Sequence, residues 1–185
     1  MLGVEAFSTE RLLAERIAEK HFSDLYRMWR DARVMETLGG VRSEQESLAQ
    51  LGMALAHWER YGFGMWVLRE KTSGELAGHA GLRFAEFDGW PELDLGYSLR
   101  PEFWGKGLAT EIASAVVSLG FEKLGSEHIT AISLPTNIAS RRVLEKIGFR
   151  YERDTVFRNL PHVLYRIQRA AFLSSQTEGQ QPQDV

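Results

Sequence analysis

The spacing of the apolar residues changes from helical to extended at Phe63, and this change constrains the fold more than any other feature of the chain. Before it, apolar residues recur at the i, i+3, i+4, i+7 spacing of a helix over 22–29, and Ser43 with Glu46 forms a capping box that opens a second helix. The inner face of the second helix is expected to hold Leu48, Leu51, Leu55 and Trp58. From Phe63 the period is two, which predicts strands over 63–70, 75–84 and 92–99.

The rest of the chain alternates between the two patterns. Helices are predicted over 108–124 and 137–147, and further strands over 10–17, 128–134, 150–157 and 162–169. This order indicates an α/β (α+β mixed) fold, a sheet covered by helices, in a single domain over residues 1–173. Residues 174–185 are rich in glutamine and poor in apolar side chains, so they are expected to form a disordered tail.

Composition excludes several classes of chemistry. The 185 residues carry a net charge of −3 and no cysteine, so no thiolate nucleophile and no disulfide is possible. The slight acidity argues against a nucleic-acid partner, and no apolar run is long enough for a membrane helix. The five histidines are scattered, so no metal site is expected. We therefore expect a cytoplasmic protein with no membrane partner, and its oligomeric state, monomer or homodimer, stays open.

A glycine-rich turn lies between the strand predicted over 92–99 and the helix that follows it. Its sequence is Trp104-Gly105-Lys106-Gly107-Leu108-Ala109-Thr110. Such a turn leaves backbone N–H groups free at the positive end of a helix, which favours a phosphate group, and Lys106 adds a cation. Neither the Walker spacing nor the dinucleotide fingerprint is present. The alternative is that both glycines only permit a tight turn.

Two longer segments carry a family resemblance. The run Leu95–Glu111, which includes this turn, resembles the acetyl-CoA-binding motif of the GNAT N-acetyltransferases, and Asn137–Phe149 resembles their second signature. Thr9–Leu12 and His162–Tyr165 resemble the branch that contains the ribosomal-protein N-terminal acetyltransferases. The resemblance covers residues 8–170. One departure is Trp104, which stands where the family motif usually has arginine or glutamine.

The resemblance implies a central seven-stranded mixed, mostly antiparallel sheet with about four flanking helices. Its fourth and fifth strands would part to admit the pantetheine arm of acetyl-CoA. Leu99 would offer its backbone groups to the pantetheine amides, and the amides from Gly105 to Thr110 would hold the pyrophosphate. Asn137 would face the pantetheine arm, although a plain helix N-cap explains an asparagine there equally well.

Two residues are candidates for proton transfer. By the same resemblance the hydroxyl of Ser140 could protonate the departing thiolate of coenzyme A, or it could be an inert residue of the first helical turn. Asp94 is an acidic residue in an otherwise apolar strand, and burial would raise its pKa toward that of a useful base. An ion pair with Arg83 is the alternative role for Asp94, while Glu92 and His79 are weaker candidates for the base.

These features together predict an enzyme that moves an acetyl group from acetyl-CoA to a primary amine. No cysteine can carry the acetyl group, so direct attack within a ternary complex is expected. The branch resemblance favours a protein N-terminal amine, small-molecule amines remain open, and the acidic balance fits a cationic acceptor. The alternatives are an acyl-CoA sensor without turnover and a nucleotide-binding protein. Thiol release on addition of amines would distinguish the enzyme from the sensor.

Overall fold

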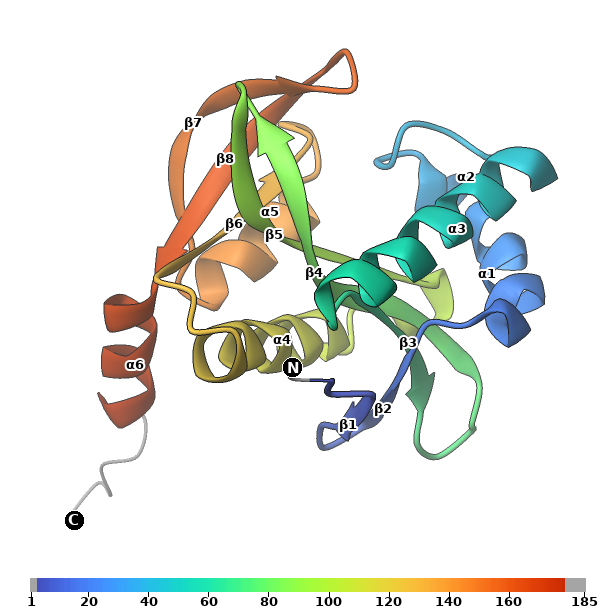
Figure 1. Ribbon diagram of the computed structural model, residues 1–185, viewed down its shortest axis with the longest axis horizontal. Helices are drawn as coiled ribbons and strands as arrows, with labels where there is room; N and C mark the ends of the chain where they lie inside the picture. Colours follow the sequence, from blue (N-terminus) through green and yellow to red (C-terminus); the bar gives the residue numbers. More distant parts are fainter. Residues whose placement is uncertain (1–2, 179–185) are drawn as a thin grey trace.

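The computed structural model describes residues 3–178 and contains one eight-stranded sheet with the strand order β1-β2-β3-β4-β5-β6-β8-β7. Neighbouring strands are antiparallel except for β5 and β6, which are parallel. The strands are β1 (Ala6–Ser8), β2 (Leu12–Arg16), β3 (Met65–Glu70), β4 (Leu76–Phe87), β5 (Trp90–Leu99), β6 (His128–Ser133), β7 (Arg150–Phe157) and β8 (Leu160–Gln168). The sheet is thus mixed and mostly antiparallel, as predicted (Figure 1).

The prediction of seven strands is wrong by one, because the chain before β2 adds a short edge strand. The N–H of Thr9 donates to the carbonyl of Leu12 at 2.9 Å and closes a turn, and β1 then pairs with β2 from Ala6 opposite Glu15 to Ser8 opposite Leu13. Three residues are too few to show an alternating period in the sequence, which explains the omission.

The six α-helices of residues 3–178 also exceed the four predicted. They are α1 (Phe22–Trp29), α2 (Ala32–Met35), α3 (Glu44–Tyr61), α4 (Leu108–Lys123), α5 (Ile138–Lys146) and α6 (Arg169–Glu178). Helix α6 includes residues 174–178, the first part of the segment for which the sequence predicted a disordered tail. The ring of Phe172 on α6 packs 5.4 Å from that of Phe121 on α4 and so docks the first turn of α6 on that helix. Residues 179–185 lie outside the described part of the chain.

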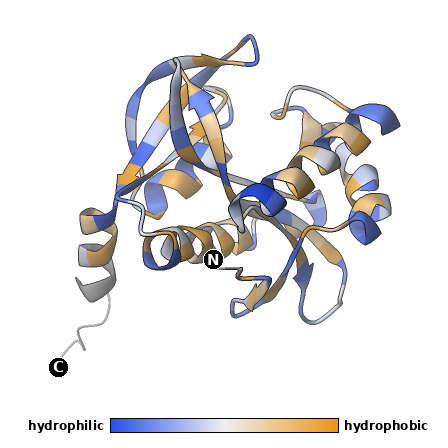
Figure 2. Ribbon diagram, viewed as in Figure 1, coloured by the Kyte–Doolittle hydropathy of each residue, from blue (hydrophilic) through white to orange (hydrophobic). Residues whose placement is uncertain are grey.

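The helices cover both faces of the sheet. Helix α4 lies so close to one face that a Cβ on Gly120 would come within 2.7 Å of Ile129 and 2.8 Å of Leu82. Helices α1 to α3 gather on the other side of β3 and β4 (Figure 1). Hydrophilic and hydrophobic residues both occur along β8 (Figure 2), and its consecutive residues Val163, Leu164 and Tyr165 are all buried, so both faces of the strand are covered there. No helix of the described chain is long and apolar enough to cross a membrane.

One residue of the expected inner face of α3 lies elsewhere. Leu51 and Trp58 are buried and Leu55 is partly buried, but Leu48 is 51% exposed. The small side chain of Ser47 takes the inner position instead, and its hydroxyl donates to the carbonyl of Ser43 at 2.8 Å. A prediction from hydrophobicity assigns the leucine to the buried face and the serine to the exposed face, and here the two are reversed.

Two hairpin turns bring the ends of β4, β5, β7 and β8 together. Asp88 and Gly89 join β4 to β5 with φ angles of 54° and 83°, and Arg158 and Asn159 join β7 to β8 with 51° and 61°. Two consecutive left-handed residues are the mark of a type I′ turn, which lets both strands run to its edge. Both hairpins are therefore longer than the sequence predicted, and the ring of Phe87 lies 5.5 Å from that of Phe157 between them.

The sheet parts between its two parallel strands, which are the fourth and fifth of the seven predicted strands, as the family resemblance implied. Asp94 opposite Thr130 is the one register pair between β5 and β6 among the described residues. Beyond that pair β5 continues to Leu99 and β6 to Ser133 without further pairing. The parting leaves backbone groups of both strands facing a gap that opens toward the start of α4.

Candidate active site

The glycine-rich turn requires its two glycines. After β5 the chain forms a 3₁₀ turn over Pro101–Phe103, and Gly105 and Gly107 then adopt φ angles of 71° and 77°. A side chain at either position would be strained in this left-handed conformation. Gly107 is the N-cap of α4 and offers no side chain to the free N–H groups of the first helical turn. The turn is therefore built to leave those donors available.

No acceptor in residues 3–178 meets the backbone N–H groups from Gly105 to Thr110. The first helical hydrogen bond runs from the N–H of Glu111 to the carbonyl of Gly107 at 3.1 Å. A Cβ added at Gly105 would meet no atom within 4 Å, so the surface of the turn is open. Free donors at a helix N-terminus favour an anion.

The N-terminal segment holds the turn in place. Arg11 donates through Nη1 to the carbonyl of Lys106 at 2.7 Å and through Nε to Glu111 at 2.7 Å. The hydroxyl of Thr9 donates to the same carboxylate at 2.5 Å, and the backbone N–H of Arg11 does so at 2.8 Å. Sequence reasoning recorded Thr9–Leu12 only as part of a resemblance. Its physical role is to join the N-terminal edge of the sheet to the first turn of α4.

Leu99 directs its backbone groups toward the gap in the sheet. The N–H of the next residue, Arg100, donates to the carbonyl of Ala77 in β4 at 2.8 Å, and successive residues of a strand point in opposite directions. The carbonyl of Leu99 accepts a hydrogen bond of 2.7 Å from Nε1 of Trp104. Within residues 3–178, its N–H is left facing the gap without an acceptor.

Asn137 is the N-cap of α5, and its side-chain oxygen accepts from the N–H of Ser140 at 3.1 Å. The capping role left open by the sequence is thus observed. The hydroxyl of Ser140 lies 3.0 Å from the phenol oxygen of Tyr97 on β5, across the gap. Burial raises the pKa of Tyr97 to about 12, so its phenol stays protonated at neutral pH. Sequence reasoning missed Tyr97, whose only signal was its place where the two strands part.

Asp94 is 1% exposed and pairs with Arg83, which stands opposite it on β4. Nε and Nη2 of Arg83 both lie 3.1 Å from Oδ2, whereas Oδ1 is buried without a partner within the described residues. Burial raises the pKa of Asp94 to about 6, against the opposing effect of the Arg83 charge. The ion pair anticipated as one alternative is present, and the carboxyl still titrates close to neutral pH.

The other two candidates for the base differ from Asp94 in their surroundings. Glu92 binds Arg166 at 2.7 Å and Nε2 of His128 at 2.9 Å, and hydrogen bonds from these two residues lower its pKa despite burial. Burial lowers the pKa of His79 to about 4, and its Nε2 accepts from Nε1 of Trp29 at 3.4 Å. Glu92 therefore lies in an ion-pair network, while His79 is neutral at pH 7.

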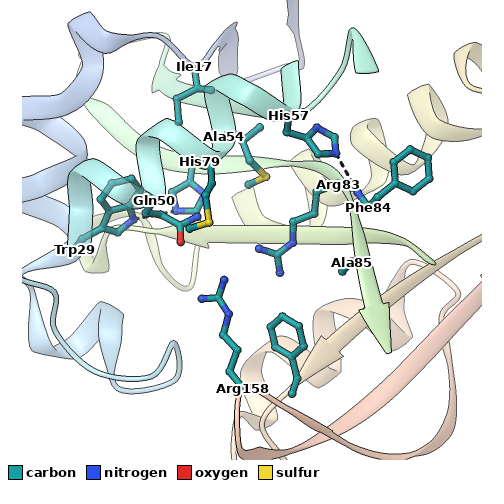
Figure 3. Close-up of a pocket in the computed structure, with 14 residues that line it drawn as sticks. Ile17, Trp29, Gln50, Ala54, His57, His79, Arg83, Phe84, Ala85 and Arg158 are labelled. Atoms are coloured by element: carbon teal, nitrogen blue, oxygen red, sulfur yellow. Dashed lines mark hydrogen bonds between the residues drawn. The ribbon is translucent and has the colours of Figure 1, made fainter. Parts of the chain in front are cut away.

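A cavity of about 240 Å³ lies on the same face of the sheet as Asp94, between α3, β4 and the turn that joins β7 to β8. Its lining includes Trp29, His57, His79, Arg83 and Arg158 (Figure 3). His57 is held at both ring nitrogens, since Nδ1 lies 2.8 Å from the carbonyl of Phe63 and Nε2 accepts from the N–H of Phe84 at 3.1 Å. It is a wall of the cavity and not a free base. No group of three or more metal-ligating side chains occurs in the described chain.

Comparison with known proteins decides the family. Residues 11–150 match the model of the acetyltransferase (GNAT) domain. The chain belongs to the GNAT acetyltransferase family. The uncharacterised N-acetyltransferase YnaD of Bacillus subtilis is 30% identical over 147 residues, which are 78% of this chain and 82% of YnaD.

Solved GNAT acetyltransferases share the fold. An acetyltransferase from Agrobacterium tumefaciens superposes with a TM-score of 0.80 at 24% identity, over 91% of this chain and 97% of its own. A Vibrio cholerae protein described as a ribosomal-protein-serine acetyltransferase gives 0.72 at 17% identity, over 91% of this chain and 99% of its own. At these identities the two structures establish the fold alone. The protein is thus an acetyl-CoA-dependent acetyltransferase of the GNAT fold.

Proposed function

We propose that this GNAT enzyme acetylates a primary amine by direct attack on acetyl-CoA, with Asp94 as the proton acceptor. The observation that carries the proposal is the arrangement around the parting of β5 and β6. Asp94 stands where the parting begins, the hydroxyl of Ser140 lies across it, and the free N–H groups of Gly105 to Thr110 lie at its open end. Acetyl-CoA supplies the acetyl thioester, and these N–H groups hold its diphosphate.

The chain's own groups manage the protons. An amine is mostly ammonium at neutral pH and must lose a proton before its nitrogen attacks. Oδ1 of Asp94 has no partner among the described residues and its pKa is about 6, so this carboxylate takes the proton. As the carbon–sulfur bond breaks, the hydroxyl of Ser140 donates a proton to the thiolate while the phenol of Tyr97, 3.0 Å away, hydrogen-bonds to its oxygen. The serine oxygen regains a proton from water, and Asp94 releases the proton of the amine to water, once the products have left.

The acceptor enters through the cavity beside Arg83. The resemblance of Thr9–Leu12 and His162–Tyr165 to ribosomal-protein N-terminal acetyltransferases makes a protein N-terminal amine the first acceptor to test. Small amines are the second class. The cavity is open to a chain end and is small enough to select the first side chain or two.

Thiol release from acetyl-CoA tests the proposal, measured over a panel of peptides with free N-termini and small amines. We expect intersecting initial-rate patterns when both substrates are varied, because both must be bound at once. Parallel patterns together with an isolated acetyl-enzyme would overturn direct attack. Stabilisation by acetyl-CoA without thiol release from any amine would overturn the whole proposal.

A further inference from the structure

The charge of the acceptor cavity is unlike that of the chain as a whole. Arg83 reaches the cavity from β4 and Arg158 from the turn between β7 and β8, and both point their guanidinium groups into it (Figure 3). Arg42, in the segment before α3, lies with its guanidinium 5.8 Å from the ring of Trp29, which lines the same cavity. Three segments that are far apart in sequence therefore bring positive charge to one place.

Few negative charges balance this group. Asp94 pairs with Arg83, but no acidic side chain of residues 3–178 forms an ion pair with Arg42 or Arg158. The negative charge of Glu46 opposes the fall in the pKa of Arg42. The carboxylate of Glu46 already accepts hydrogen bonds of 2.8 Å from the N–H and hydroxyl of Ser43. Asp88 on the neighbouring hairpin binds Arg153 at 2.9 Å. The two remaining titratable groups of the cavity, His57 and His79, are neutral at pH 7.

The guanidinium groups also act on one another. Burial lowers the pKa of Arg42, and the charges of Arg158 and Arg83 lower it further. The pKa of Arg158 is lowered by burial and by the charge of Arg83. Arg42 and Arg83 are half-buried and Arg158 is exposed at the edge of the cavity. Like charges held this close repel one another, and an anion between them reduces that cost. Arginine suits this role because its planar fork matches the oxygens of a carboxylate or phosphate.

We propose that the acceptor is a primary amine that carries a carboxylate or phosphate group, and that Arg158 and Arg42 hold this group while Asp94 receives the proton of the amine. The proposal rests on the proposed function, because it takes the cavity as the acceptor site. It reverses the expectation of a cationic acceptor drawn from the overall charge of −3, since the local charge of the cavity is positive. The anionic group can belong to a free amino acid or aminophosphate, or to an acidic residue next to a peptide N-terminus.

Matched pairs of acceptors test the charge requirement. The pairs are aspartate and asparagine, phosphoethanolamine and ethanolamine, and the amidated peptides Ser-Asp-Ala and Ser-Asn-Ala, with spermidine as a cationic amine. We expect kcat/KM from thiol release to favour the anionic member of at least one pair by tenfold or more. A preference confined to the first two pairs identifies a small acceptor, and one that includes the peptides identifies a chain end.

Variants locate the recognition. Arg158→Gln and Arg42→Gln should reduce that preference at least fivefold, mainly through the KM of the acceptor, and Arg158→Glu should favour the neutral member. Arg150→Gln is the matched control, because Arg150 is exposed at the opposite end of β7 and its side chain forms no hydrogen bond or ion pair with the described residues. Calorimetry with succinate, an anion without an amine, should show binding to the wild type and to Arg150→Gln that is weakened by Arg158→Gln.

Two results would overturn the anionic acceptor. One is equal or better use of the neutral member in every pair, and the other is a preference that survives in Arg158→Gln and Arg42→Gln. Either result leaves amine acetylation intact if thiol release is seen. The absence of thiol release with every amine, while acetyl-CoA still raises the Tm, would instead contradict the proposed function.

Discussion

The indole N–H of Trp104 donates a hydrogen bond of 2.7 Å to the carbonyl oxygen of Leu99, and so joins the glycine-rich turn to the end of β5. Trp104 stands where the family motif usually has arginine or glutamine, and the residue is 48% exposed. Its role is thus to fix the shape of the turn through a neutral donor. The two segments proposed to hold the pantetheine arm and the diphosphate are fixed relative to each other by this contact.

Trp104→Phe removes the donor and keeps most of the ring. We expect a loss of stability of about 1 kcal/mol, the usual net value of one hydrogen bond, and a several-fold rise in the KM for acetyl-CoA. Chemical denaturation and steady-state kinetics measure the two effects. An unchanged KM would show that the turn keeps its shape without this bond.

Gly105→Ala places a side chain at a φ of 71° where it meets no other atom, so its direct effect is backbone strain of about 1 kcal/mol. We expect the variant to bind acetyl-CoA at least tenfold more weakly, because the free N–H groups shift. Gly125→Ala is the control, since Gly125 has a φ of 66°, equally open surroundings and a position beyond the other end of α4. It should lose similar stability without weaker binding of acetyl-CoA by calorimetry, and equal weakening in both variants would refute the assignment.

Asp94→Asn should lower kcat/KM for the amine about 10²-fold and abolish the fall in activity below about pH 6, because the carboxyl with a pKa of about 6 is the proton acceptor. Glu92→Gln changes a carboxyl two residues away, in the ion-pair network, and should keep the fall in activity below about pH 6, the acid limb of the pH profile. Persistence of the limb in Asp94→Asn would assign it to another group.

The same carboxyl links stability to pH. The folded-state pKa of Asp94, about 6, is above its ordinary value of 3.8, so the native state binds more protons in between. The contribution of Asp94 is therefore present below about pH 4 and is lost as the pH rises to 6. Between these values the Tm of the wild type should fall relative to that of Asp94→Asn in thermal scans. Parallel Tm curves would contradict the raised pKa.

Ser140→Ala should lower kcat by about 10- to 100-fold with little change in the KM for acetyl-CoA, because its hydroxyl acts when the thiolate leaves. Tyr97→Phe should have a smaller effect on kcat. If the two hydroxyls form one proton path, the double variant loses little more than Ser140→Ala alone. Independent, multiplying losses would show that they act separately.

Sequence reasoning predicted the elements that repeat regularly. The period change at Phe63, the capping box at Ser43 and the turn from Gly105 to Gly107 located the strands, α3 and the start of α4 to within a few residues. It failed where a few residues depend on tertiary contacts. Strand β1 depends on pairing with β2, and the first turn of α6 packs on α4 through the contact between Phe172 and Phe121.

The candidate site divides in the same way. Asp94, Ser140 and the glycines stand inside local patterns that a sequence displays. Tyr97 lies within the Leu95–Glu111 run, but its contact with Ser140 is not visible in the sequence. Arg42 and Arg158 stand outside any local pattern, because each gains its place from a neighbour distant in the chain. Arg158 depends on a two-residue hairpin turn that places its side chain over the cavity, and no spacing in the sequence pairs it with Arg83.

The parting of β5 and β6 also bears on mechanical strength. Asp94 opposite Thr130 is the one register pair between β5 and β6 among the described residues, so the two halves of the sheet are joined by little direct backbone pairing. Packing of the helices on both halves must supply the rest of the resistance to separation. A pantetheine arm bound in the gap between β5 and β6 would hydrogen-bond to their unpaired backbone groups, as a further strand would. Without coenzyme, the sheet should open transiently between β5 and β6, and the amide hydrogens of β6 should exchange faster than those of β4.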